Sequence, residues 1–388
     1  MRTKVGQYAF TFALMFAIGL GLPISPLLAS RMGATWIEIG LMGAAWGVAF
    51  TFSAFLTGRI SDRVGRRPVL VVSAALNALA ALLFLRALSV SELIIIRGLE
   101  GLAWACFWPP MEALATETVD TEQVGRGIGL ITTVYGVAFA IGSFSGGSLA
   151  DVFGFPLAFG TYLGTASLAT VMAWFVESPK HEQPKEHLAR ERFLPRLRSR
   201  AIAAGNLLGA SYTFGLASVM ALLSVYAAGL GIPVFWIGVV FSMFWAGRMI
   251  GAASAGSASD RFGRRRVAVV GLILGCIGFV LVGMANEIVP LAAGVLLAGV
   301  SVGASFPVSV AIIADNIQAD LRGSAMGFFE MICAIAFMTA SALGGAAAQV
   351  FSPRSPYGAS AIVYVSCAVA LCVLLPASQR DKSKRPPV

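Results

Sequence analysis

The sequence predicts an all-α integral membrane protein whose twelve membrane-spanning helices form two related six-helix halves. The first observation is composition: 57% of the 388 residues are hydrophobic and 12% are charged, whereas soluble domains are about 25% charged. The second is a succession of apolar runs long enough to cross a hydrocarbon core, which takes about 20 helical residues. The third is a ten-residue motif that begins at position 58 and recurs at position 256, each copy between apolar runs.

Most of the helices are expected in stretches without charged residues. These stretches are 5–30, 39–58, 68–85, 127–150, 152–176, 267–286, 288–314, 331–353 and 355–379. The run 201–247 is too long for one helix and is interrupted by Gly229-Leu230-Gly231-Ile232-Pro233, so it predicts two helices. The second of these continues past Arg248 to Ser259. The segment 93–113, which contains internal charges, completes the twelve.

The chain divides into 1–176 as an N-terminal six-helix bundle, 177–200 as a cytoplasmic linker and 201–388 as a C-terminal six-helix bundle with a short basic tail. Mixed charges and three prolines in the linker favour a connector over a folded module. The halves stay in register beyond the motif, since Gly101 matches Gly299 at the same spacing. Parallel repeats of this kind predict two halves related by an axis along the membrane normal, with a binding site between them near the midplane.

The net charge of +9 is expected to set the orientation of the chain rather than to bind nucleic acid. The basic residues lie in short loops and not on one amphipathic face. One side, which includes both termini, has 23 Lys and Arg residues, and the other has Arg31, Arg86 and Arg354. By the positive-inside rule, both termini are therefore cytoplasmic and the chain lies in an inner or plasma membrane.

The repeated motif combines glycines, an aspartate and arginines. It reads Gly58-Arg59-Ile60-Ser61-Asp62-Arg63-Val64-Gly65-Arg66-Arg67 and then Gly256-Ser257-Ala258-Ser259-Asp260-Arg261-Phe262-Gly263-Arg264-Arg265. Glycine permits close helix approach and a tight turn, while arginine remains in water. A G-x-x-x-D-R-x-G-R-R string between the second and third helices of each half resembles the signature of the major facilitator superfamily of secondary transporters. The resemblance covers nearly the whole chain and implies alternation between outward- and inward-open states.

The resemblance implies a cytoplasmic gate at this motif. In that family the aspartate faces the start of a helix in the other half, here near Gly323 or Gly127, where the macrodipole carries about half a positive charge. The expected gate residues lie at cytoplasmic helix ends: Gly58, Asp62, Arg63, Gly65, Arg66, Glu117, Gly256, Asp260, Arg261, Gly263, Arg264 and Asp315. Glu117 and Asp315 are the expected partners of the motif arginines. The alternatives are a local helix cap for each aspartate and simple solvation for the other two acids.

Four charges are expected inside the membrane. The string from Leu93 to Gly101 resembles the family's fourth-helix motif, with Glu100 where glutamine is usual. Arg97 and Glu100 share a helix face and form either a structural pair or a group that binds cargo or couples to protons. Arg248 and Glu330 are expected to pair across helices or to hold the inner gate, with static packing of one ion pair as the alternative.

Aromatic and polar residues near helix breaks are the expected cavity lining. The prolines at 109, 110 and 307 let their helices bend. The candidates beside them and on the first and seventh helices are Tyr8, Phe12, Trp104, Trp108, Asn206, Tyr212 and Phe306. The alternative for each is packing against lipid or another helix. The string from Ile141 to Gly147 resembles the exporters' G-P-x-x-G-G motif, with Ser143 in place of proline.

The sequence therefore predicts a secondary transporter, most similar to proton-linked exporters of small organic molecules. One alternative is an importer or facilitator of a small metabolite or of an organic anion held by Arg97. Another is a non-transporting sensor on the same fold, which would carry a large soluble domain. An ATP-driven pump or enzyme is disfavoured because no G-x-x-x-x-G-K-[ST] loop occurs. A monomer is expected, with a small-molecule substrate, protons and the bilayer as partners, and without cofactor, metal site or nucleic acid.

The charge bias predicts the result of topology mapping. In a background without the five native cysteines, single cysteines at positions 126 and 187 are expected to react with an impermeant thiol reagent only from the cytoplasm. A cysteine at position 354 is expected to react from outside intact cells, because it lies on the side poor in Lys and Arg. Labelling of the position-187 cysteine from outside intact cells would contradict the predicted orientation.

Overall fold

The computed structural model describes residues 2–117, 124–176, 199–318 and 321–375, without the side chains of 2–4, 115–117, 124–129 and 324. The predicted linker therefore lies almost entirely outside the described residues. Six helices form the first half: α1 (Arg2–Arg31), α2 (Trp36–Val64), α3 (Arg66–Arg86), α4 (Val90–Glu117), α5 (Val124–Val152) and α6 (Phe155–Ala173). The second half contains α8 (Arg200–Ala217), η2 (Ser218–Leu222), α9 (Leu223–Gly229), α10 (Val234–Phe262), α11 (Arg264–Met284), α12 (Ile288–Asp315), α13 (Arg322–Val350) and α14 (Ser355–Leu374).

The described chain crosses the bundle twelve times. Eleven segments are long and apolar enough to span a membrane, one of them being the continuous α8–η2–α9 segment. The twelfth, α4, has 28 residues and carries the Arg97 and Glu100 charges that interrupt its apolar run. The two-helix prediction for 201–247 is confirmed, because a turn at 230–233 separates α9 from α10. The π-helical turn η2, which interrupts the α-helix of the seventh crossing, was not predicted.

The repeated motif forms the same turn in both halves. Gly65 between α2 and α3 has φ 92°, and Gly263 between α10 and α11 has φ 91°. This left-handed region strains any residue with a Cβ. The glycine therefore lets the chain reverse over a single residue, and the next helix begins immediately with Arg66 or Arg264.

The halves meet tightly at one end of the molecule, through two glycine contacts. A Cβ at Gly40 of α2 would lie 2.9 Å from the Cα of Gly345 in α13. A Cβ at Gly147 of α5 would lie 2.7 Å from the Cα of Gly238 in α10. The two contacts are related by the internal repeat, since Gly40 corresponds to Gly238 and Gly147 to Gly345. We call this the closed end.

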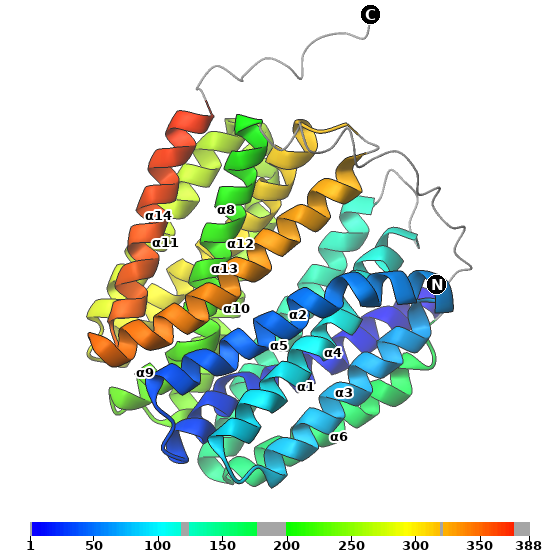
Figure 1. The fold of residues 1–388 in the computed structure, drawn as a ribbon, viewed down its shortest axis with the longest axis vertical. Helices are drawn as coiled ribbons and strands as arrows, with labels where there is room; N and C mark the ends of the chain where they lie inside the picture. The colour runs from blue at the N-terminus through cyan, green and yellow to red at the C-terminus, as the bar shows by residue number, and fades with distance from the viewer. Residues whose placement is uncertain (1, 118–123, 177–198, 319–320, 376–388) are drawn as a thin grey trace, which may run out of the picture.

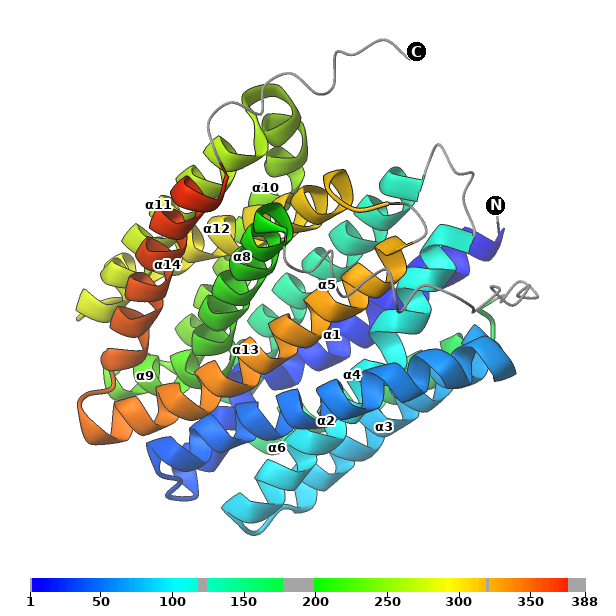
Figure 2. The same ribbon diagram turned by 45° about the horizontal axis from the view of Figure 1, so that its top comes forward.

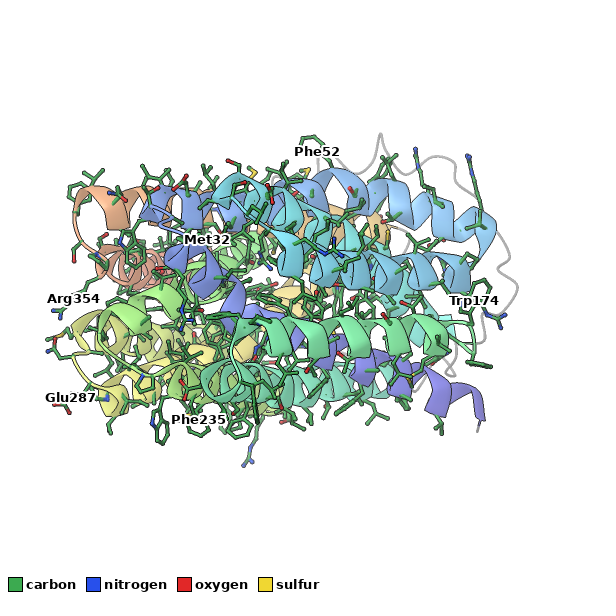
Figure 3. The ribbon with its side chains drawn as sticks, turned by 90° about the horizontal axis from the view of Figure 1, so that it is seen from below. Met32, Phe52, Trp174, Phe235, Glu287 and Arg354 are labelled. Carbon is green, nitrogen blue, oxygen red and sulfur yellow. The ribbon has the colours of Figure 1, made fainter. Side chains whose placement is uncertain are left out.

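The halves diverge toward the opposite end, which carries the N-terminal start of α1 and the final turn of α14 (Figures 1 and 2). Arg354 and Glu287 lie at the closed end, and Trp174 lies at this open end (Figure 3). Near the open ends of their helices, a Cβ added at Gly58, Gly256 or Gly323 would meet nothing within 4 Å. Phe52 projects from the flank of the bundle and is 75% exposed, as suits a surface that faces lipid.

The glycine contacts predict a test of the closed end. Gly40→Ala places a methyl group 2.6 Å from the Ser341 carbonyl oxygen, and such overpacking costs about 1–3 kcal/mol. The closed end is therefore expected to open more often. A single cysteine at Leu216, which lines the cavity between the halves, is then expected to react faster with an impermeant reagent added on the side of the closed end. The matched control is Gly160→Ala in α6, where a Cβ meets nothing within 4 Å. Equal reactivity in the two variants would contradict the assignment.

Candidate functional site

A cavity of about 170 Å³ lies between the two halves, and both contribute to its wall. Ten of the 23 lining residues are aromatic: Trp46, Phe50, Trp104, Trp108, Tyr135, Phe139, Tyr212, Trp245, Phe306 and Phe337. Four charged side chains also line it: Arg97, Glu100, Arg248 and Glu330. An apolar chamber with a few placed charges is the usual form of a small-molecule site.

Aromatic rings join the halves around this cavity. The rings of Phe139 in α5 and Trp245 in α10 stack with centroids 4.4 Å apart. The rings of Trp46 in α2 and Phe337 in α13 lie 5.0 Å apart. On the α4 side, Trp104 stacks on Trp108 at 6.2 Å, one turn further along the helix. The cavity therefore has a broad π-surface that continues from one half to the other.

The Arg97 guanidinium and the Glu100 carboxylate form an ion pair within α4. Both are buried, at 8% and 5% exposed, so the pair compensates a charge that would otherwise cost about 2.5–3.5 kcal/mol at the membrane centre. The structure thus contains the pair expected from the sequence, on the cavity wall.

Two further residues, which were not among those expected from the sequence, complete the environment of Glu100. The Tyr162 hydroxyl of α6 lies 2.9 Å from Glu100 Oε1 and 3.0 Å from Asn77 Oδ1 of α3. The Asn77 amide nitrogen donates to the Ser73 carbonyl at 2.9 Å, which turns Oδ1 toward the tyrosine. An asparagine within the apolar run 68–85 was the signal in the sequence that could have identified this network.

The hydrogen bonds of the Tyr162 hydroxyl depend on whether Glu100 carries a proton. The Tyr162 hydroxyl has one hydrogen and lies between two oxygen atoms that accept hydrogen bonds. With Glu100 ionised, it donates to one of the two and leaves the other without that bond. With Glu100 protonated, the carboxyl donates to Tyr162, and Tyr162 donates to Asn77. The geometry therefore accommodates both forms of Glu100.

The expected ion pair between Arg248 and Glu330 is not formed. Arg248 Nη1 donates to the Tyr135 hydroxyl at 3.0 Å, and its guanidinium lies over the rings of Tyr135 and Trp245. These groups hold Arg248 toward α5. Glu330 has no described basic partner and lies near enough to Glu112 of α4 for the two acids to repel each other; Glu112 was also not among the expected site residues. The two acids come from opposite halves. Their proximity could not be predicted from either helix alone.

At the open end, the motif residues form ion pairs within their own halves. Asp62 pairs with Arg66 at 2.5 Å, and Asp260 pairs with Arg264 at 2.5 Å. Asp315 of α12 lies 3.1 Å from Arg264 Nε, one of the pairs suggested by the sequence. The Glu117 side chain lies outside the described residues. Among those described, Asp62 contacts Arg66 and not the start of α13, so the contact proposed for the latch is absent in this conformation.

Three of the expected lining residues lie elsewhere. The cavity wall includes Trp104, Trp108, Tyr212 and Phe306 but not Tyr8, Phe12 or Asn206. Phe12 is 38% exposed and stacks on Phe16, the next turn of its own helix. Asn206 is buried beside Gly205, which packs on α12. Helix assignment alone could not decide which face of α1 or α8 turns toward the cavity.

Comparison with known sequences gives a consistent family. A family model described as the Major Facilitator Superfamily matches residues 8–252 and 206–388. An uncharacterized MFS-type transporter, MJ1560, of Methanocaldococcus jannaschii is 23% identical over 360 residues, covering 91% of this chain and 92% of the relative. The multidrug resistance protein MdtG of Klebsiella pneumoniae is 24% identical over 369 residues, covering 92% of this chain and 87% of MdtG.

Solved structures share the fold at lower sequence identity. A mutant of the nucleoside transporter NupG has a TM-score of 0.78 at 13% identity, covering 96% of this chain and 100% of that chain. A bacterial homolog of the human lysosomal transporter Spinster, in an inward-facing and occupied conformation, has a TM-score of 0.78 at 13% identity, covering 96% of each chain. At these identities the likeness establishes the fold alone.

Proposed function

Since the chain belongs to the major facilitator superfamily, whose members are transporters and not enzymes, it is a multi-pass membrane transporter, and we propose that it exports a small organic solute in exchange for protons. The observation that carries this proposal is the cavity between the halves, which combines aromatic walls with buried carboxylates. The name of the MdtG relatives, multidrug resistance protein, supports export over uptake. One chain encloses the whole cavity, which supports action as a monomer.

Alternating access follows from the two different ends of the bundle. The excess of Lys and Arg near the termini supports placing the open end on the cytoplasmic side of an inner or plasma membrane. In that orientation the present conformation is inward-open. Rocking of the halves would separate the glycine contacts and bring the open ends of α2 and α13 together, so that the cavity faces outward.

The open-end ion pairs suggest how the gate works. In the inward-open conformation Asp62 is held by Arg66. When the halves close, the same carboxylate is proposed to meet the start of α13, where the unpaired backbone N–H groups attract an anion. The gate then exchanges one partner of Asp62 for another, so the free-energy difference between states stays small enough for cycling.

Removal of the Asp62 charge is predicted to alter the balance between states. Asp62→Asn is expected to insert normally, to lower transport several-fold and to favour the inward-open state, because the dipole contact is worth about 0.3–2 kcal/mol. The measurement is the reactivity of the Leu216 cysteine from the cytoplasmic side, together with transport. The matched control is Asp151→Asn, an exposed acid at the closed end of α5. If transport and reactivity both match the control, Asp62 acts only as a local helix cap.

Proton coupling is proposed to run through Glu100, with Glu330 as the second candidate. Rocking that changes the water exposure of Glu100, or its distance from Arg97, changes its proton affinity between states. The Tyr162–Asn77 arrangement supports this role because its hydrogen bonds rearrange with the proton. Both histidines of the chain lie in the linker, so a membrane carboxylate is the remaining ordinary titrating group.

The proposed function and its coupling are tested together in proteoliposomes. The parent protein is expected to acidify or alkalise the lumen when a transported organic solute is added, and to accumulate that solute against its gradient under an imposed pH difference. Glu100→Gln is expected to abolish accumulation and to retain counterflow exchange, because an amide can still donate to Tyr162 but carries no exchangeable charge. Absence of solute-linked proton movement in the parent would refute proton coupling. Accumulation by the variant at the parental level would show that Glu100 is structural. Glu330→Gln would then test the second candidate in the same way.

A further inference from the structure

Arg248 is the cavity cation whose charge no described carboxylate pairs. Arg97, the other cation of the cavity, is bonded to Glu100. Within the described residues, the hydrogen-bond partner of Arg248 is the neutral Tyr135 hydroxyl, and its guanidinium carbon lies over the rings of Tyr135 and Trp245. The positive charge is therefore concentrated at one place on the cavity wall.

The guanidinium keeps most of its hydrogen-bonding capacity. It has five N–H donors in a planar fork, and Tyr135 accepts from one of them. Its carbon lies over the rings of Tyr135 and Trp245, 5.5 and 5.1 Å from their centroids, and ring faces accept none of the remaining N–H groups as a carboxylate would. The edges of a guanidinium are the part that binds a carboxylate, sulfonate or phosphate oxygen, and four of the five N–H donors of Arg248 have no described hydrogen-bond acceptor.

The backbone that carries Arg248 is fixed in position. Gly299 and Gly303 of α12 lie directly against the backbone of α10 at Arg248, and a Cβ at either glycine would clash with it. The side chain therefore starts from a rigid helix contact, and Tyr135 of the other half holds its far end. A cation held at both ends is pre-organised for a ligand and loses less conformational entropy on binding.

We propose that the cargo is an organic anion whose negative group binds the edge of Arg248 and whose aromatic or apolar body lies among Trp104, Phe139 and Trp245. This inference rests on the proposed transport function, in which Glu100 and Glu330 exchange protons and Arg248 is left to bind cargo. It differs from an anion site at Arg97, because Glu100 already occupies that guanidinium. The cavity volume of about 170 Å³ suits a body of about one aromatic ring, since an engineered apolar cavity of about 150 Å³ holds benzene.

A cationic cargo would need an acid free to receive it. Glu100 is bonded to Arg97 and Tyr162, and a cation placed at Arg248 would meet a charge of its own sign. The ring faces nearest the cavity cation are already taken by Arg248 itself. The arrangement of described side chains thus favours an anion at this position over a cation.

Three benzene derivatives of similar size test the charge preference of the purified protein: benzenesulfonate, benzenesulfonamide and benzylammonium. Binding is measured by isothermal titration and by thermal stabilisation, since a ligand of the folded state raises the melting temperature. Benzenesulfonate is expected to bind about tenfold or more tightly than neutral benzenesulfonamide, as charge-assisted hydrogen bonds contribute at this level. Equal affinities, or a preference for benzylammonium, would overturn the inference.

Substitutions test whether Arg248 causes the preference for benzenesulfonate over benzenesulfonamide. Arg248→Gln is expected to lose it while retaining benzenesulfonamide binding, which also shows that the variant is folded. Arg248→Lys is expected to restore part of it, because the charge returns without the planar fork. The matched control is Arg354→Gln at the closed end, which is expected to bind as the parent does. An anion preference that survives in Arg248→Gln, or disappears in Arg97→Gln alone, would overturn the assignment to Arg248.

Transport of the same probes separates this inference from the proposed function. Proton-driven transport of benzylammonium without any anion preference would uphold the exporter and reject the anion site. An Arg248-dependent preference for benzenesulfonate, without proton-linked movement in proteoliposomes, would uphold the anion site and reject proton-coupled export.

Discussion

A charged side chain in a hydrocarbon layer has no water to stabilise it, so Arg97, Glu100 and Arg248 depend on protein neighbours. Arg97 has Glu100, and Glu100 in turn has Tyr162 from another helix. Arg248 has a hydroxyl and two ring faces. These requirements draw α3, α4, α5, α6 and α10 around one cavity. The polar groups thereby specify how the helices meet, in an environment where hydrophobic burial between helices contributes little.

The frame around that cavity is built by the internal repeat. The closed-end contacts Gly40–Gly345 and Gly147–Gly238 are repeat mates of each other, and the motif turns at Gly65 and Gly263 have nearly the same φ. Small residues let helix backbones approach closely without interlocking side chains. A pair of equivalent small contacts can act as a gate, because both can open through one rotation of the halves.

The cavity itself departs from the repeat. The positions in the second half that match Arg97 and Glu100 are Val295 and Ala298, and the position in the first half that matches Arg248 is Phe50. The duplicated residues thus serve the frame and the gate, whereas the charged residues of the cavity occur once. The two halves need to be equivalent only where they move. The charged residues that would contact cargo can occur in one half alone, since a cargo molecule occupies a single asymmetric site.

Much of this protein was determined by local properties of the sequence. Apolar runs and loop charges predicted the twelve crossings, since a segment in hydrocarbon must satisfy its backbone hydrogen bonds internally and therefore forms a helix. Spacing within one helix predicted the Arg97–Glu100 pair, because i and i+3 share a face. Only the tertiary structure decided that Arg248 faces Tyr135 and not Glu330, that Glu330 lies near a second acid, Glu112, and that Tyr8, Phe12 and Asn206 lie off the cavity wall. Those outcomes depend on the rotation of each helix about its axis and on the packing of the two halves, which residue order along a single helix does not specify.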